Sequence, residues 1–439
     1  MTPIITVAYL SVLACALFVL IRWPRLRLQG EEPVGLFTLI ALLFTAGLDM
    51  GLVMLPLAEF PLYEEDPAFG FTNALAVEFG MWGPLVWLMY FVATFYFIAI
   101  EPRLQLFQIP VVKWVYNLTV IATCSFTCYL FMSNLPTYAP NLSQGAVWGL
   151  VVVVIATAVI SSGNMAVMKW LAILSSYGFG MLAFTALAMI AFVYSRVGLP
   201  DFFANLGLLA DYFRHLPRFA TPISDYHEFY LFWWFAWSIM IGQFVARFVG
   251  GMRVWQLAVA MVALPAVPLG LWFSVLFVYH QGGVVIPDWL NWFMIGVGVV
   301  FVINSLDSLI RLYSANLGWS RETLGDRRYY PLHFLLQLTL VGAYVFTPFE
   351  IQWVGLVVAA LYGAIYLLMA RHIAKLDRIG APGAACRTRS RPGPGATADR
   401  VSRACRCRLR NGRRRKTRPR PRSRTWTTAR SSGCRGPDP

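Results

Sequence analysis

Charged residues are scarce in this chain of 439 amino acids: Asp, Glu, Lys and Arg make up only 13% of it, whereas hydrophobic residues make up 58%. A water-soluble fold cannot bury that much apolar length in one core. Apolar runs of about 20 residues, the length that crosses a bilayer as a helix, recur along most of the sequence. The composition therefore excludes an ordinary soluble protein and predicts an all-α polytopic membrane protein.

The residue patterns of several catalytic classes are also missing. Among five histidines and seven cysteines there is no metal-ligand spacing, and no nucleophile–histidine pair is evident. The phosphate-binding pattern G-x-x-x-x-G-K-[ST] does not occur. We therefore expect neither an enzyme nor an ATP-driven pump, and no cofactor beyond a sodium ion. Cys15, Cys124 and Cys128 lie within apolar runs and are expected to pack there.

The net charge of +15 comes from the C-terminal tail. Residues 381–439 hold 18 basic and two acidic residues, so the 380 residues before them carry a net charge of −1. We expect the tail, 379–439, to be disordered, because an Arg-, Pro- and Gly-rich segment cannot form a core. Its 17 arginines against one lysine fit a GC-rich gene translated in a shifted frame. A lipid-binding polybasic segment or a nucleic-acid tail is the alternative; we favour the frame shift and expect no nucleic-acid partner.

Hydropathy predicts eleven membrane spans. Basic residues gather in alternate connections, which by the positive-inside rule predicts an external N terminus and a cytoplasmic C terminus in a bacterial-type plasma membrane. The connection 195–226 is the exception, and its amphipathic part is predicted to lie along the membrane interface. The predicted spans are 3–22, 34–58, 78–100, 111–133, 146–162, 168–194, 227–249, 254–279, 289–313, 332–348 and 353–370.

Two of these spans have irregular sequences. The second contains TAGLDMG (45–51) followed by Pro56, and the seventh contains two adjacent tryptophans and then Gly242. Each would begin a set of five spans, and interrupted helices at matching places in inverted repeats mark the substrate site of many transporters. We therefore divide the chain into a peripheral span, a first repeat, an interfacial helix and a second repeat, at 1–33, 34–200, 201–226 and 227–378.

Aromatic side chains cluster in two of the spans. The segment WGPLVWLMY (82–90) is expected to place three rings on one side of a helix: Trp82, Trp87 and Tyr90. The segment FYLFWWFAW (229–237) is expected to place three more within a narrow arc: Trp233, Trp234 and Trp237. Rings that face one cavity bind a methylated, permanently charged ammonium group by cation–π attraction. Packing against neighbouring helices is the simpler alternative.

Four segments, in this order along the chain, resemble the betaine/carnitine/choline transporter family. A glycine-rich stretch followed by A-E-P matches LFTAGLDMGLVMLPLAEF, and the patterns W-G-x-x-x-W-x-x-Y, F-Y-W-A-W-W-x-S-W and F-x-x-T-S-x-D-S match 82–90, 229–237 and 301–308. The chain departs from these patterns at Leu231, Ala236, Ile239 and Gly250, and family histidines are absent at Met81 and Leu85. The resemblance covers residues 1–378, and the family's first span is expected to be missing.

The resemblance implies a fold like that of sodium-coupled neurotransmitter symporters, a homotrimer, and secondary transport of betaine, choline or carnitine, with a role in osmoprotection. It implies a substrate box formed by Trp82, Trp87, Tyr90 and Trp234, with Trp233 beside them. Trp237 would line a neighbouring passage. It also implies a sodium site at Thr45, Leu48, Asn304 and Ser305, with Phe301 nearby. Asn304 stands where the family has a hydroxyl.

Asp49 replaces the middle glycine of the family's glycine-rich stretch. A carboxylate at membrane depth is costly and is usually functional. We expect Asp49 to hold sodium, to carry a proton, or to be the counter-ion of a substrate without its own carboxylate. A carboxylate satisfied by unwound backbone amides is the structural alternative. Glu59 and Asp307 match acidic positions of the family patterns.

The sequence leaves two other functions open. One is a transporter of altered specificity that takes amino acids or sulfonium analogues. The other is a non-transporting membrane sensor or a degenerate family member, favoured by the altered sodium-site residue and the aberrant tail. For the transporter, a sodium or proton gradient, or exchange, is the expected energy source.

Overall fold

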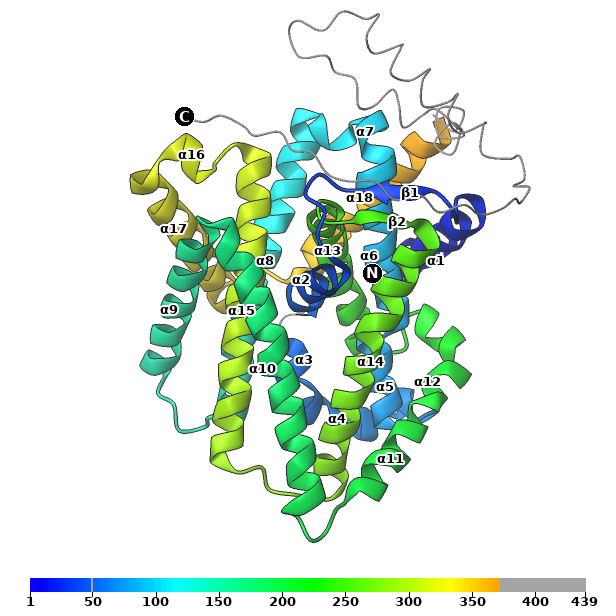
Figure 1. Cartoon of the computed structure of the whole chain (residues 1–439), viewed down its shortest axis with the longest axis vertical. Helices are drawn as coiled ribbons and strands as arrows, with labels where there is room; N and C mark the ends of the chain where they lie inside the picture. Colours follow the sequence, from blue (N-terminus) through cyan, green and yellow to red (C-terminus); the bar gives the residue numbers. More distant parts are fainter. Residues whose placement is uncertain (49, 372–439) are drawn as a thin grey trace, which may run out of the picture. The chain divides into compact units, whose positions relative to one another are not determined.

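The computed structural model describes residues 1–48 and 50–371, and these are almost entirely helical (Figure 1). Within them, nine helical segments are long and apolar enough to cross a membrane. This confirms the prediction of an all-α polytopic membrane protein. The nine are α1 (Thr2–Arg22), the stretch from α5 to α7 (Ala74–Leu104), α8 (Pro110–Tyr138), α9 (Gln144–Ser162), α10 (Met165–Phe192), α13 (Asp225–Ala246), α14 (Val254–Gln281), α15 (Asp288–Leu317) and α18 (Ile351–Arg371).

The remaining two predicted spans are helical but less regular. The second is divided into α2 (Leu36–Leu48), α3 (Gly51–Met54) and α4 (Pro56–Glu65). The tenth is α17 (Asp326–Phe346), preceded by α16 (Arg321–Leu324). Polar residues reduce the hydropathy of α17, but they point inward: the Tyr313 hydroxyl lies 2.8 Å from His333 Nδ1, and the Ser125 hydroxyl donates to Gln337 Oε1 at 2.6 Å. Buried polar groups with partners are compatible with a membrane interior.

The predicted interfacial segment forms short helices. They are α11 (Leu199–Leu208), α12 (Ala210–Arg214) and a 3₁₀ turn, Leu216–Ala220. Asp201 accepts from the backbone N–H of Gly198 at 2.8 Å and so caps the start of α11. On α11, Phe202 is buried and its neighbour Phe203 is 62% exposed, as an amphipathic helix requires. Its position at the membrane interface stays a prediction.

The third predicted span is broken at Gly83, which the sequence interpretation did not anticipate. Helix α5 (Ala74–Trp82) ends there and α6 (Pro84–Phe95) begins at the next residue. A Cβ atom on Gly83 would lie 2.1 Å from the carbonyl oxygen of Phe79, so only glycine fits. Pro84 then occupies the first position of α6, where its missing N–H is tolerated. A π-helical turn, Tyr96–Ile100, and α7 (Glu101–Leu104) complete the span.

The predicted interruption of the seventh span is wrong, because α13 is one unbroken helix. Gly242 is instead a packing position: a Cβ atom there would lie 2.2 Å from Cβ of Ala93 on α6. On the other side, a Cβ atom on Gly355 of α18 would lie 2.3 Å from the carbonyl oxygen of Phe232. Two glycines thus let α13 approach α6 and α18 closely. In α13, 89% of the apolar stretch is buried, compared with 28% in α1, so α13 is central and α1 peripheral.

Two short strands were not predicted. Strand β1 (Arg27–Gln29) pairs antiparallel with β2 (Gly250–Arg253), with Leu28 opposite Met252 (Figure 1). The pair joins the connection that follows α1 to the connection that follows α13. The division into five-helix repeats stays a prediction. Asp49 and the tail, 379–439, lie outside the described residues.

Candidate functional site

Five of the six aromatic residues singled out from the sequence lie in mutual contact. The rings of Trp82 and Trp234 meet edge to face with centroids 5.1 Å apart, and Trp82 meets Trp233 in the same way at 5.5 Å. Trp233 and Trp234 are stacked at 5.2 Å. We call Trp82, Trp87, Tyr90, Trp233 and Trp234 the aromatic cluster. It brings together side chains from α5, α6 and α13.

Tyr90 connects the two halves of the aromatic cluster. Its ring lies 5.2 Å from that of Trp87 and 6.2 Å from that of Trp234, both nearly perpendicular. All five side chains are at most 1% exposed. Trp237 is equally buried but lies one turn further along α13, outside these ring contacts in the described part of the chain. Five of the six predicted rings are therefore brought together without Trp237, and their role as a substrate box stays a prediction.

The break at Gly83 explains how the aromatic cluster is held. The last carbonyls of a helix have no partner within the helix. Two of those at the end of α5 accept indole N–H groups: Trp234 donates to the Met81 carbonyl at 2.7 Å, and Trp87 donates to the Trp82 carbonyl at 3.0 Å. The expectation that these three rings lie on one side of a single helix is therefore wrong, because Trp82 belongs to α5 whereas Trp87 and Tyr90 belong to α6.

Two glycines bring α2 and α3 against the aromatic cluster. The Tyr90 hydroxyl donates to the carbonyl of Gly47 at 2.9 Å. A Cβ atom on Gly47 would lie 3.3 Å from the Tyr90 ring, and one on Gly51 would lie 2.4 Å from Cη2 of Trp82. Gly47 and Gly51 therefore present backbone surfaces against which these rings lie.

The predicted ion-site residues also meet, between the end of α2 and the middle of α15. Asn304 donates from Nδ2 to the hydroxyl of Thr45 at 2.5 Å, and the Ser305 hydroxyl donates to the Thr45 carbonyl at 3.2 Å. All three side chains are fully buried. The Oδ1 atom of Asn304 has no hydrogen-bond partner among the described residues. The amide of Asn304, the hydroxyls of Thr45 and Ser305 and the backbone carbonyl of Thr45 therefore lie together in the interior.

Leu48 and Phe301 differ in their relation to this point. Leu48 is the last residue of α2, where backbone carbonyls lack helical partners. Phe301 lies within α15, and its ring packs against Phe44 at 6.2 Å, so its side chain supports the site by packing. Asp49 follows Leu48 directly but lies outside the described residues.

A buried acidic group lies near the aromatic cluster, and the sequence interpretation missed half of it. Glu59 accepts hydroxyl groups from Tyr226 and Tyr230 at 2.5 Å each and from Tyr63 at 3.1 Å. Glu78 is fully buried one helical turn before Trp82, with its carboxyl beside that of Glu59. The sequence signal that could have identified Glu78 is its position as an acidic residue inside an apolar run.

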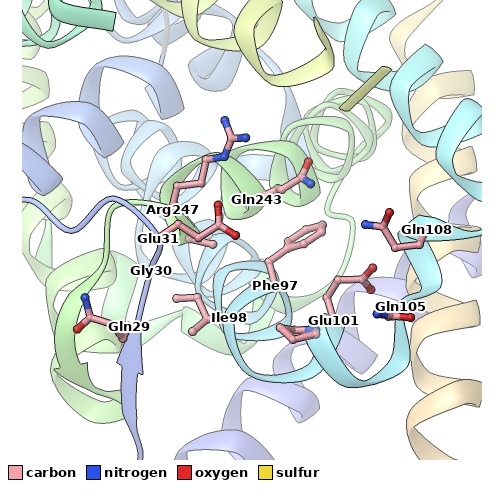
Figure 2. Close-up of a pocket in the computed structure, with 12 residues that line it drawn as sticks. Gln29, Gly30, Glu31, Phe97, Ile98, Glu101, Gln105, Gln108, Gln243 and Arg247 are labelled. Atoms are coloured by element: carbon pink, nitrogen blue, oxygen red, sulfur yellow. The ribbon is translucent and has the colours of Figure 1, made fainter. Parts of the chain in front are cut away.

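A polar cavity of about 400 Å³ lies at the other end of α13. Figure 2 shows its lining, which includes Gln243 and Arg247 of α13, Glu31 of the connection after β1, and Glu101 of α7. A second hollow of about 210 Å³ shares Gln243 and Glu101. Gln243 accepts from the hydroxyl of Tyr116 at 2.7 Å. The end of α13 beyond the aromatic cluster is thus open and polar.

Comparisons with known proteins find transporters. No protein-family profile matches the chain. An uncharacterized transporter of Mycobacterium tuberculosis is 30% identical over 129 residues, which are 27% of this chain and 21% of that protein. The glycine betaine transporter OpuD of Bacillus subtilis is 24% identical over 290 residues, 57% of each chain. A glycine betaine/proline/choline transporter of Vibrio parahaemolyticus is 28% identical over 117 residues, 24% of this chain and 20% of that protein.

The chain thus matches between about a fifth and just over half of the length of these curated relatives. Among solved structures, a Na⁺-coupled sialic acid symporter in a substrate-bound, outward-open state has 16% sequence identity and a TM-score of 0.43, covering 86% of this chain and 83% of that chain. The protein is a multi-pass membrane protein similar to transporters.

Proposed function

We propose that the protein is a secondary active transporter of a quaternary ammonium compound, of the betaine, choline or carnitine type, in the betaine/carnitine/choline transporter family. The carrying observation is the aromatic cluster, in which five fully buried rings from three helices converge. Purely hydrophobic packing does not require four tryptophans at one point, whereas a methylated cation is stabilised by about 0.5–2 kcal/mol on each ring face. The names of the relatives from Bacillus subtilis and Vibrio parahaemolyticus support the same substrate class.

The rings have to separate for the substrate to bind. In the described conformation the edge of one of the rings of Trp82 and Trp234 lies on the face of the other, with centroids 5.1 Å apart. We propose that the Gly83 break lets α5 move with Trp82 while α6 keeps Trp87 and Tyr90 in place. The cation then replaces the edge of one ring on the face of another. Such exchange of a ring–ring contact for a ring–cation contact costs little, since both are electrostatic contacts with the ring quadrupole.

The polar cavity at the end of α13 supplies the second half of the path. Between the aromatic cluster and this cavity, Trp237 is the remaining buried tryptophan on α13. We propose that the cavity faces the cytoplasm, because Arg247 lines it and the nearby β1–β2 pair carries Arg27 and Arg253, as the positive-inside rule requires of a cytoplasmic face. We infer a route from the aromatic cluster past Trp237 to Gln243 and the cytoplasm.

Sodium fits the residues at Thr45, Asn304 and Ser305. A hard monovalent cation prefers oxygen ligands, and the C-terminal carbonyls of α2 carry partial negative charge at the end of the helix. The partnerless Oδ1 of Asn304 adds an oxygen aimed at no other described group. Bound there, sodium would link α2 to α15 and supply the driving gradient. A proton is the alternative coupling ion, and the homotrimer is proposed from the family resemblance alone.

Uptake by proteoliposomes tests the proposal. Purified protein is reconstituted and given labelled choline, betaine or carnitine, with a sodium gradient, a pH gradient or neither. We expect saturable uptake of at least one of the three, driven by one gradient, and much lower uptake of glycine. The Trp234→Leu variant and empty vesicles are the controls. Uptake that ignores both gradients and all three ammonium compounds would contradict the proposal and favour a sensor or a degenerate protein.

A further inference from the structure

The buried acidic group at Glu59 and Glu78 is not used by the transport scheme above. Two carboxyl groups lie side by side inside the protein: Glu59 is 1% exposed and Glu78 is fully buried. Neighbouring carboxylates in a water-excluded site repel each other strongly, and one proton between them removes most of that repulsion. No cation from the described residues pairs with either one.

The hydrogen bonds assign different roles to the two residues. Glu59 is surrounded by the hydroxyls of Tyr63, Tyr226 and Tyr230, which donate to it, so its oxygens act as acceptors. Both carboxyl oxygens of Glu78 lack a hydrogen-bond partner among the described residues. A fully buried carboxylate without donors is costly, whereas a protonated one supplies its own donor to the neighbouring Glu59.

The surroundings of the pair connect it to both the surface and the aromatic cluster. Tyr226, whose hydroxyl donates to Glu59, is partly exposed, so the shortest way from Glu59 to the surface that these contacts show is through this side chain. Tyr230 packs on Trp82 with ring centroids 5.9 Å apart, and Glu78 lies four residues before Trp82 on α5. Other titratable groups on packed elements include His227 and Glu228 of α13, Tyr138 of α8, Tyr212 and Asp211 of α12, and His280 of α14, which pairs with Glu64 at 3.0 Å.

We propose that Glu59 and Glu78 share one proton, and that this proton leaves when a cation binds to the aromatic cluster. The inference rests on the proposed function for its ligand. A fixed positive charge beside Trp82 stabilises the fully ionised pair, so the O–H bond of Glu78 breaks and the proton passes to water through the Tyr226 side. No other bond changes. By reciprocity, protons must weaken cation binding as much as the cation weakens proton binding.

Two quaternary ammonium compounds of different net charge test the electrostatic origin. Choline is a permanent cation, whereas betaine carries its own carboxylate and has no net charge. We expect the affinity for choline to rise with pH, by up to about tenfold for each pH unit while the proton is being lost. The rise should be smaller for betaine. In the Glu78→Gln variant, choline affinity should be independent of pH.

The shared proton is tested without any substrate. Infrared spectra of the purified full-length protein in membranes, recorded against pH, should contain a carboxylic C=O band that titrates. The band should vanish in Glu78→Gln and persist in Glu65→Gln, which alters an exposed acid of α4. Tyr230→Phe, which keeps the ring but removes one donor to Glu59, should move the titration to higher pH. An unchanged band in Glu78→Gln, or the same midpoint in Tyr230→Phe, would overturn the shared proton.

A second readout tests the coupling. Choline added to the weakly buffered protein should release protons, detected with a pH dye, and the Glu78→Gln variant should release none. Release that is absent while choline binds, as shown by tryptophan fluorescence, would overturn the coupling and leave the proposed function standing. If choline, betaine and carnitine all fail to bind, the proposed function and the coupling both fail, and the infrared band alone decides on the shared proton.

Discussion

The indole rings of Trp82 and Trp234 meet edge to face, with centroids 5.1 Å apart and planes at 81°. Trp82 ends α5 at the Gly83 break, and Trp234 lies in the middle of the central helix, α13. One contact therefore joins the helix that ends at the break to the helix around which the others pack. A ligand that enters between these rings has to separate them, either by rotation of a side chain or by the proposed movement of α5.

Removal of an aromatic face should weaken binding more than a change in ring size. We expect Trp234→Leu to weaken choline or betaine binding by at least about 1 kcal/mol, or roughly fivefold, and Trp234→Phe to lose less. Calorimetry on the purified variants measures this. Phe235→Leu is the matched control, because Phe235 is the next residue on α13 but packs against Tyr362. Equal affinities for Trp234→Leu and Trp234→Phe, with both proteins folded, would show that the ring faces do not hold the substrate.

The close approach of α3 to the aromatic cluster depends on Gly51. In Gly51→Ala the new Cβ atom would lie 2.4 Å from the Trp82 indole, so the ring has to shift. We expect a several-fold loss of substrate affinity together with a lower melting temperature. Gly149→Ala in α9 is the control, since nothing lies within 4 Å of a Cβ atom there. Unchanged affinity in Gly51→Ala would mean that Trp82 can move freely without consequence.

The packing of α18 against α13 should also be sensitive to an added side-chain atom. A Cβ atom at Gly355 would lie 2.3 Å from the carbonyl oxygen of Phe232, and a backbone atom cannot move aside as a side chain can. We expect Gly355→Ala to lower the free energy of unfolding by at least about 1–3 kcal/mol. Gly363→Ala, two turns later in the same helix, has open space and should change little. Thermal unfolding followed by fluorescence distinguishes them; similar melting temperatures would contradict the close approach.

Asp307 is a structural residue by its contacts. It pairs with Arg311 at 3.0 Å, with side chains 0% and 10% exposed, and accepts from the Ser161 hydroxyl at 2.9 Å. Arg311 also donates to carbonyls of Ser161 and Asn164, so the pair fastens α15 to the end of α9. Asp307→Ala leaves a buried guanidinium uncompensated and should cost about 3–5 kcal/mol of stability.

The exposed pair Arg321–Asp326 offers a control for Asp307. Asp326→Ala breaks an ion pair of similar length on the surface, where water replaces the partner. Thermal unfolding of both variants should show a large loss only for Asp307→Ala. If the two variants unfold at the same temperature, the Asp307–Arg311 pair does not stabilise the packing of α15 against α9.

Asp49 gives a prediction from the sequence alone. If Asp49 carries a coupling proton, Asp49→Asn should abolish uptake driven by a pH gradient. If it completes the sodium site, the variant should need more sodium, and if it is the substrate's counter-ion, Asp49→Gly should shift preference from choline to betaine. Uptake by proteoliposomes separates these outcomes. Unchanged affinity, ion dependence and substrate ranking in Asp49→Asn would exclude any functional charge there.

Hydropathy predicted the helices well because it follows the free energy of moving side chains into a bilayer. It cannot detect where the backbone breaks. The break at Gly83 was missed because apolar residues continue on both sides of it. The carbonyls that it frees at the end of α5 accept indole N–H groups from Trp234 of α13 and from Trp87 of α6. For α13 the error was the opposite: Gly242 suggested an interruption, but it is a contact with Ala93.

The candidate site was predictable where spacing and family pattern agree. Trp82, Trp87 and Tyr90 were selected together, and the structure brings them together, although across two helices. The pairing of Glu78 with Glu59 was not predictable, because it arises only when α4 brings Glu59 beside α5. The β1–β2 pair escaped notice because strands of three and four residues carry no periodic signal.

The β1–β2 ladder has a consequence for how the protein is made. Strand β1 ends at Gln29, but its partner strand begins at Gly250, so about 220 residues must be synthesised before the pairing is complete. By then, every helix from α2 to α13 has left the ribosome. Contacts of such long sequence separation form late, because the intervening chain must first be ordered. The ladder can therefore join the connection after α1 to the connection after α13 only once α13 has been synthesised, and α14 to α18 are still to follow at that point.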